Sequence, residues 1–390
     1  MIDVEALRAE TPGVDHVVHF NNAGASLMTR KTVSAITAYL ESELTLGGYE
    51  ALAAHESAVD GVYASVAALV AADPSEVALS DSATGAWNMI VGGLNLGEGD
   101  RILTTTTEYG SNWAVYLRLR ERYGVETTVV RDAATGEIDL EELEREAIRG
   151  ASLISVNHIP TNGGVVNPAA DIGSIAKRAG VPFLLDACQS VGQLPVDVVE
   201  IGCDFLTGTS RKYIRGPRGV GFGFIASRST NLIEPVFLDN VAARVGANSV
   251  VPRGDARRIQ WFEHPWANVM GFREAINSSL DIGVAAVWNR IQQLAGSLRD
   301  GLHDIPGVVV RDRGSIQSGL VTFTVDAMPA PEVRHLLAAR GVNISHSTVN
   351  SAPFDMTMRG LETVCRASVH AFNTDEEIAV LLSAVEDAAR

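Results

Sequence analysis

The sequence predicts an α/β protein, with a mainly parallel sheet in a large domain and a smaller α+β domain toward the C-terminus. Up to Phe224, short apolar segments alternate with segments of helical spacing, a rhythm typical of parallel sheets covered on both faces by helices. After Phe224 this pattern changes. With 390 residues, 46% of them hydrophobic and 20% charged, the chain is long enough for two domains with large cores.

The elements of the large domain follow from this rhythm. In the turn at 81–88, Ser82 and Thr84 offer hydroxyls and free backbone N–H groups at a helix start, which is a ready anion site. We expect Asn167 to cap the next helix before Pro168, and Gly180 to end it. Strands are expected at 17–20, 77–79, 101–105, 127–130, 153–157, 181–185 and 201–206, and helices at 4–10, 32–44, 56–71, 89–94 and 140–148.

The smaller domain is predicted from the last third of the chain. Residues 228–265 show no clear periodicity, and a long helical pattern over 267–302 is interrupted at Gly283. The final helix opens at Thr374 with a capping-box pattern. Strands are expected at 308–310, 321–325, 342–345 and 366–368, and helices at 330–340 and 374–389. We therefore expect a large domain over 16–265 and a small one over 275–390, with residues 1–15 packing on the small one.

Composition excludes several functional classes. A net charge of −16 argues against nucleic acid or an anionic membrane as a partner, because both would repel the chain. The three cysteines, Cys188, Cys203 and Cys365, have no zinc-type spacing, so neither a disulfide framework nor a metal site is expected. The acidic, amphipathic N-terminus is unlike a signal peptide. These features predict a cytoplasmic location.

One acid and one lysine organise the prediction of function. Asp186 ends the apolar run at 181–185, and Lys212 follows the apolar segment at 201–206. Both are therefore expected at the carboxyl ends of neighbouring strands, where open α/β sheets bind ligands. A carboxylate there can hold a proton on a pyridine nitrogen, and a lysine can form a Schiff base with an aldehyde. Although such an acid is often a helix cap and such a lysine a surface charge, the pair together predicts pyridoxal 5′-phosphate (PLP).

Several motifs extend this interpretation. They are A-T-G-A-W-N at 83–88, D-A-C-Q-S at 186–190, T-S-R-K at 209–212, G-P-R-G-V-G at 216–221 and R-A-S-V-H-A-F-N-T-D-E-E at 366–377. With these motifs the chain resembles the class V branch of fold-type I PLP enzymes, which includes aminotransferases and cysteine desulfurases. The sequences of these motifs are most similar to those of the ergothioneine-type C–S lyase and the isopenicillin N epimerase branch. The resemblance implies a fold-type I transferase fold with a seven-stranded sheet, and a homodimer with its site at the interface.

The resemblance also implies roles for individual residues. Lys212 would form the aldimine and move the Cα proton, Asp186 would pair with the pyridine nitrogen, and Gln189 would reach the ring hydroxyl. Tyr109 stands where these families commonly stack a histidine on the ring, and Thr161 stands where desulfurases have an asparagine. The phosphate would be held by Ala83, Thr84, Thr209 and Arg211, and the amino-acid substrate by Arg366, through its carboxylate, with Asn22, Ala25 and Asn350.

The reaction is predicted from a position at which this chain differs from the cysteine desulfurases. The loop at 345–354 occupies the region that carries the nucleophilic cysteine in desulfurases. In this chain the loop contains no cysteine, and Asn350 falls near the position of that nucleophile. We read Cys365 as a core residue, since neighbours on a strand point to opposite faces and Arg366 faces the site. The expected reaction is β-elimination with C–S bond cleavage through the Lys212 aldimine, without a persulfide cysteine. A class V aminotransferase, an amino-acid epimerase and a cofactor-binding dimer without turnover stay open as alternatives, and so do substrate and leaving group.

Overall fold

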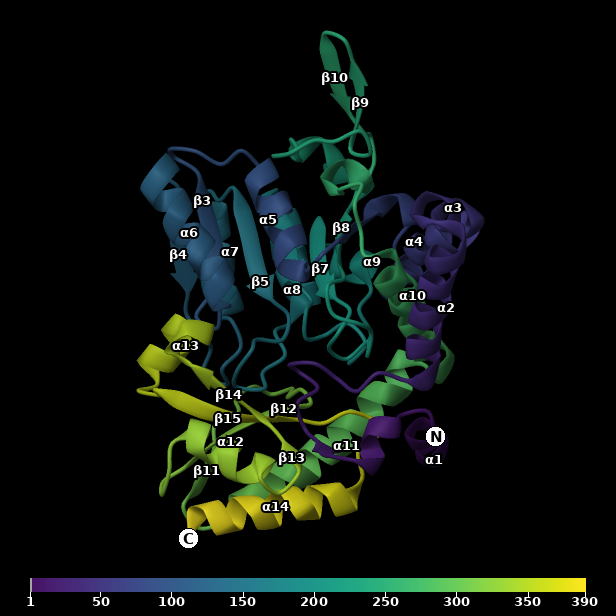
Figure 1. Cartoon of the computed structure of the whole chain (residues 1–390). Coiled ribbons are helices and arrows are strands. Elements are labelled where there is room, and N and C mark those ends of the chain that lie inside the picture. Colours follow the sequence, from purple (N-terminus) through teal and green to yellow (C-terminus); the bar gives the residue numbers. More distant parts are fainter. Residues whose placement is uncertain (1) are drawn as a thin grey trace.

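The computed structural model describes residues 2–390, and its centre is a seven-stranded sheet (Figure 1). The strand order is β2-β8-β7-β6-β5-β3-β4, and β8 runs antiparallel to both of its neighbours while the other pairs are parallel. This confirms the predicted α/β fold with a mainly parallel sheet. The strands are β2 (Val77–Ser80), β3 (Arg101–Thr105), β4 (Glu126–Val130), β5 (Leu153–Asn157), β6 (Phe183–Asp186), β7 (Phe205–Thr209) and β8 (Gly221–Ile225).

The central strands are apolar throughout because helices cover both faces of the sheet. Every residue of β5, β6 and β7 is buried. Since side chains alternate between faces along a strand, Phe183 and Leu185 pack in one apolar cluster and Leu184 in another. The first cluster includes residues of α4 (Glu56–Val70), α7 (Leu140–Ile148), α8 (Ala169–Ala179) and α10 (Trp266–Ile282), and the second includes α5 (Ala83–Gly93) and α6 (Gly110–Tyr123).

A four-stranded antiparallel sheet lies below the large one in Figure 1, with strand order β11-β12-β15-β14. Its apolar cluster is separate from those of the large sheet. Arg8 bonds Glu377 at 2.7 Å, which ties the N-terminal helix to this part. These observations support the predicted division into 16–265 and 275–390 with 1–15, which we keep as a proposal. The elements here are β11 (Val308–Val310), β12 (Leu320–Val325), β14 (Ser345–Thr348), β15 (Thr363–Ser368), α1 (Val4–Ala9), α11 (Val284–His303), α12 (Ala330–Ala338), α13 (Pro353–Met358) and α14 (Asp375–Ala389).

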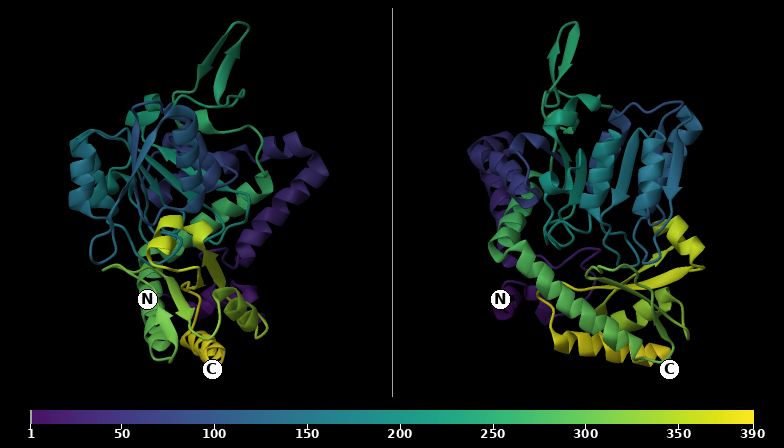
Figure 2. Two further views of the ribbon diagram at one scale, coloured as in Figure 1. Left: turned by 90° about the vertical axis from the view of Figure 1, so that its left-hand side faces the viewer. Right: turned by 180° about the vertical axis from the view of Figure 1, so that it is seen from behind.

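The remaining elements link or extend these two parts. A short parallel pair joins β1 (Val18–His19) to β13 (Val342–Asn343). Figure 2 shows the hairpin of β9 (Ala243–Gly246) and β10 (Ser249–Pro252) projecting beyond the rest of the chain. The others are α2 (Arg30–Leu46), α3 (Gly48–Ala54) and α9 (Val198–Ile201). None of the helices within residues 2–390 is both long and apolar enough to cross a bilayer.

The structure corrects some local predictions. Strand β7 begins at Phe205, because Ile201 belongs to α9. Asn167 does not cap α8, since Pro168 occupies the N-cap position. Its buried amide instead donates to the Asn157 carbonyl at 2.8 Å and accepts from Ile138 N–H at 3.1 Å, so it joins two other segments. Gly180 does end α8, with the positive φ of 67° that glycine tolerates best.

Candidate active site

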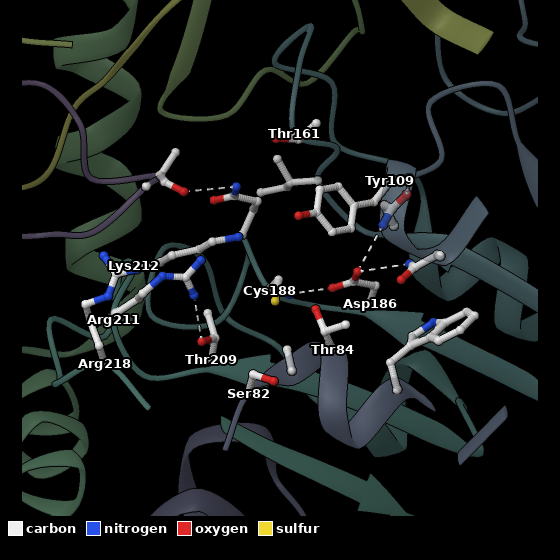
Figure 3. Close-up of a pocket in the computed structure, with 18 of the residues that line it drawn as sticks. Ser82, Thr84, Tyr109, Thr161, Asp186, Cys188, Thr209, Arg211, Lys212 and Arg218 are labelled. Atoms are coloured by element: carbon white, nitrogen blue, oxygen red, sulfur yellow. Dashed lines mark hydrogen bonds between the residues drawn. The ribbon is translucent and has the colours of Figure 1, made fainter. Parts of the chain in front are cut away.

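A pocket of about 330 Å³ lies at the carboxyl ends of β5, β6 and β7 (Figure 3). It contains both Asp186 and Lys212, so the pair predicted from the sequence shares one cavity. Arg366 reaches the same cavity from β15 of the four-stranded sheet. Ten of the predicted site residues line it: Ala83, Thr84, Tyr109, Thr161, Asp186, Gln189, Thr209, Arg211, Lys212 and Arg366.

Three hydrogen bonds fix the Asp186 carboxylate. The residue ends β6, where its register partner on β5 is Asn157. Its Oδ1 accepts from Cys188 N–H at 3.0 Å, and its Oδ2 accepts from Asn157 Nδ2 at 3.1 Å and Asn112 Nδ2 at 3.4 Å. Such bonds stabilise the charged form of a carboxyl group. The geometry therefore holds the carboxylate in one fixed orientation toward the pocket, which suits a partner for a protonated ring nitrogen.

Lys212 lies three residues beyond the end of β7. Burial lowers the pKa of its amine, and the positive charges of Arg211 and Arg366 act in the same direction, against Cys188 and Asp186. A lowered pKa increases the neutral fraction of a lysine, the form that attacks a carbonyl. In Figure 3 the thiol of Cys188 lies between Lys212 and Asp186.

The start of α5 makes an anion site at one end of the pocket. The Ser82 hydroxyl caps this helix by accepting from Gly85 N–H at 3.0 Å. Arg211 donates to Thr209 Oγ1 at 3.1 Å, and Arg218 also lines the pocket. A Cβ built on Gly221 would clash with the backbone of Ser82, so glycine allows β8 to approach the helix start this closely. Free N–H groups, a helix dipole and guanidinium groups together suit a phosphate.

Unsatisfied polar atoms test whether PLP fits. Gln189 is 3% exposed, and its Oε1 has no hydrogen-bond partner among residues 2–390, although its Nε2 donates to the Ala23 carbonyl at 3.2 Å. Arg366 donates weakly to Ser347 Oγ at 3.4 Å, and its buried Nε has no partner in the same range. Because buried polar atoms are nearly always bonded, such groups indicate a ligand. The acid, the lysine and the anion site fit PLP.

Arg366 is the pocket's candidate for binding a substrate carboxylate. Burial lowers the pKa of its guanidinium to about 10, so the group is still charged at neutral pH. Within the part of the chain that the structure describes, its Nη1 has a single long contact, to Ser347, which leaves donors free for a bidentate bond to a carboxylate.

Three predicted substrate residues lie outside the pocket, and these predictions are corrected. Asn22 is fully buried and uses its amide inside the fold, donating to the Ser368 carbonyl at 2.7 Å and accepting from Ser26 Oγ at 2.6 Å. The Ala25 carbonyl bonds His19 at 3.0 Å. Asn350 is exposed, and its carbonyl packs against Gly110. Each is held by local packing that the sequence pattern does not show.

Several pocket residues were not predicted. Asn157 ends β5 beside Asp186, so the rule that located Asp186 at a strand end could have found it. Trp87, Asn112, Cys188 and Arg218 gave no such signal, since their place depends on how α5, α6 and the loops fold around the sheet. Cys365 is fully buried, as predicted. Residues 2–390 contain no group of His, Cys, Asp and Glu side chains that could hold a metal ion.

The comparison with known proteins agrees with this geometry. A family model described as aminotransferase class-V matches residues 18–381. The chain belongs to the aminotransferase class-V family. A probable cysteine desulfurase of Methanothermobacter thermautotrophicus is 27% identical to it, over 99% of this chain and 98% of the relative. A cysteine desulfurase of Haloferax volcanii is 26% identical, over 100% and 97%.

Solved structures share the fold. The apo cysteine desulfurase of Thermococcus onnurineus NA1 has a TM-score of 0.92 at 24% identity, covering 99% of this chain and 98% of that one. A C-DES mutant with glycine covalently linked to its PLP has a TM-score of 0.88 at 23% identity, covering 97% and 99%. The predicted cofactor is confirmed: this class-V enzyme is PLP-dependent.

The prediction of C–S cleavage without a persulfide cysteine is wrong. It rested on the absence of cysteine from residues 345–354. The relatives and two of the structural neighbours are named cysteine desulfurases, enzymes that use a persulfide cysteine. A further neighbour, C-DES, is named a cystine C–S lyase with cysteine persulfide as its product. The lack of cysteine in this one loop does not exclude a persulfide, because a thiol from another segment can line the pocket, as Cys188 does.

Proposed function

We propose that this class-V enzyme releases sulfur from L-cysteine and passes it to a thiol. The observation that carries the proposal is a pocket in which the amine of Lys212 and the thiol of Cys188 lie side by side, close enough for each to shift the pKa of the other. The desulfurase names of the relatives support it. The finer resemblance to the ergothioneine-type lyase and epimerase branch stays a prediction.

The roles of the residues follow from their positions. PLP, when bound, supplies an electron sink for the charge that develops at Cα. Asp186 would keep a proton on the ring nitrogen, and Arg366 would orient the substrate carboxylate. Lys212 would take the Cα proton and return it. Tyr109 would cover one face of the ring, and Thr161 and Gln189 would bond its polar edge. The orientation of the substrate and the placement of these side chains would thereby determine which substrate bond is weakened.

Cys188 is the thiol that we assign as sulfur acceptor. Cys203 and Cys365 are fully buried, whereas Cys188 lines the pocket. In the balanced reaction, L-cysteine and a thiol give alanine and a persulfide: the Cβ–S bond breaks, and an S–S bond forms. Burial raises the pKa of the Cys188 thiol to about 12, while the charge of Lys212 lowers it. Lys212 is therefore placed to accept the thiol proton as the S–S bond forms.

This function is tested by the products formed from L-cysteine. We expect equal amounts of alanine and, with a reductant present, sulfide, and one extra sulfur atom on the Cys188 peptide by mass spectrometry after a single turnover. Cys188→Ser should lower sulfide release by about 10²-fold or more. Cys203→Ala, which changes a buried cysteine outside the pocket, is the matched control.

Other products would contradict the proposal. Pyruvate and ammonia in place of alanine would show elimination. Exchange of amino groups between an amino acid and a keto acid would show transamination. Unchanged sulfide release by Cys188→Ser would remove Cys188 as the acceptor.

We propose further that two copies of the chain form a homodimer through one apolar surface. Val245 and Val250, which are partners across the projecting hairpin and so share one face of it, are 64% and 51% exposed. A two-stranded hairpin is marginally stable alone in water, and exposed apolar patches mark interaction sites. Nearby, the rings of Phe237 and Trp261, 59% and 40% exposed, lie 5.7 Å apart.

The same surface adjoins the pocket, which supports a site at the interface. His264 follows Trp261 closely in the chain. Burial lowers the pKa of His264, and a hydrogen bond with the Trp261 backbone and the charge of Asp81, a pocket residue, oppose this shift. A partner that covers the Trp261 surface would therefore lie beside the pocket.

The mass in solution checks this interface. Wild-type protein should sediment with the mass of two chains, and Val245→Asp together with Val250→Asp should weaken the dimer by about tenfold or more, since each buries a charge. Val380→Asp, at an exposed valine of α14, is the control. A monomeric wild type, or a dimer that tolerates both hairpin substitutions, would contradict the proposed interface.

A further inference from the structure

A second carboxylate lies just behind the cofactor pocket. Glu108 is 1% exposed and precedes Tyr109, the residue that leads into α6. Burial raises the pKa of its carboxyl to about 7, and the charge of Asp186 raises it as well, against hydrogen bonds from Thr104, Tyr109 and Asn112. Burying such a group is costly, and perturbed carboxyls cluster at functional sites.

Four donors converge on this carboxyl group. Its Oε1 accepts from the backbone N–H of Tyr109 at 2.7 Å and from Asn112 Nδ2 at 3.0 Å. Its Oε2 accepts from the hydroxyls of Thr104 at 2.6 Å and Tyr116 at 3.0 Å. Both oxygens are thus occupied, and the side chain has one fixed orientation.

Two of these donors continue into the pocket. Asn112 Nδ2 also lies 3.4 Å from Asp186 Oδ2, so one amide spans the two carboxyl groups. The Tyr109 N–H is shared with Asn157 Oδ1 at 3.2 Å, and Asn157 Nδ2 donates to the same Asp186 oxygen at 3.1 Å. The contacts close a ring from Glu108 through Asn112, Asp186, Asn157 and Tyr109.

We propose that Glu108 is a positioning residue, which sets the relative placement of Asp186 and Tyr109 around the PLP ring through these shared donors. In the function proposed above, on which this inference rests for the roles of these two residues, Asp186 would contact the ring nitrogen and Tyr109 would cover the ring face, whereas Glu108 does not line the pocket. The inference concerns how the cofactor is held and is independent of the sulfur chemistry proposed above.

The identity of the donors predicts which substitution preserves the role. The N–H groups of Tyr109 and Asn112 need an acceptor, whereas the hydroxyls of Thr104 and Tyr116 can also accept. Glutamine satisfies all four if its oxygen faces the first pair and its NH₂ group the second. Glu108→Gln should therefore keep the network, and Glu108→Ala should lose it.

The test uses the purified holoenzyme and reads the cofactor directly. We expect Glu108→Ala to weaken PLP affinity by about tenfold or more, and to lose most of the visible circular dichroism per bound cofactor, because the ring is no longer held in one orientation. Glu108→Gln should retain both. Asp204→Ala is the matched control: this carboxylate accepts from Phe183 N–H at 2.9 Å at the opposite end of the sheet, so its loss should lower thermal stability and leave the dichroism unchanged.

Each outcome decides the proposal. Wild-type affinity and dichroism in Glu108→Ala would overturn it, and so would equal impairment of the alanine and glutamine variants. If Glu108→Ala does not fold, Asn112→Ala decides, since it removes the bridge to Asp186 and leaves Glu108 in place. Reduced dichroism there supports the proposal, and unchanged dichroism refutes it.

Discussion

Lys212→Ala is expected to lower turnover of L-cysteine by at least about 10³-fold. The chain has three lysines, and Lys212 lines the pocket whereas Lys31 and Lys177 are exposed outside it. The substitution removes both the covalent attachment of PLP and the base for the Cα proton. Turnover and the visible absorption of the holoenzyme measure the two losses separately.

The control is Lys177→Ala, which removes an exposed lysine near the end of α8. It should match wild type in both measurements. Lys212→Arg keeps the charge but cannot attach an aldehyde, so it should fail as fully as alanine. Retention of substantial turnover by Lys212→Ala would refute the assigned role of this residue.

Asp186→Ala is expected to lower turnover by about 10²-fold or more, because the charge that stabilises the protonated ring nitrogen is lost. The substitution also strands three buried donors, from Asn112, Asn157 and the Cys188 backbone, so PLP affinity should fall too. Asp186→Asn keeps one acceptor and separates these effects: affinity should partly recover, while turnover should not.

Asp197→Ala provides the comparison for Asp186. Asp197 accepts from Val199 and Glu200 N–H groups at the start of α9. Its loss should cost about 1 kcal/mol of folding stability without changing turnover per bound PLP. Equal turnover in Asp186→Asn and wild type would contradict the proposed charge effect.

Much of the fold was predictable because its signals are local. A strand buried on both faces must be apolar throughout, so the runs at 153–157 and 181–185 located β5 and β6 within two residues. The glycine at 180 and the capping box at Thr374 ended and began helices as expected. The start of β7 was misplaced because Ile201, although apolar and buried like a strand residue, belongs to the short helix α9.

The site residues that lie at the ends of strands were predictable from the sequence, whereas those on loops and helices were less so. Asp186 and Lys212 follow adjacent strands, so strand order brings them together. Asn350 was misplaced because the direction of a loop depends on what it packs against, here Gly110. Glu108 was passed over, since its contacts converge only once α6 lies on the sheet.

By itself, the sequence determined an α/β fold whose sheet presents an acid and a lysine at one edge. Consecutive residues are enough to show the apolar periodicity and the strand ends. Only the tertiary structure decided that Trp87, Asn112 and Arg218 line that pocket, and that Glu108 and Asp186 share the amide of Asn112. Those meetings join segments far apart in the chain, and their geometry is set by the packing of whole elements, which no local pattern encodes.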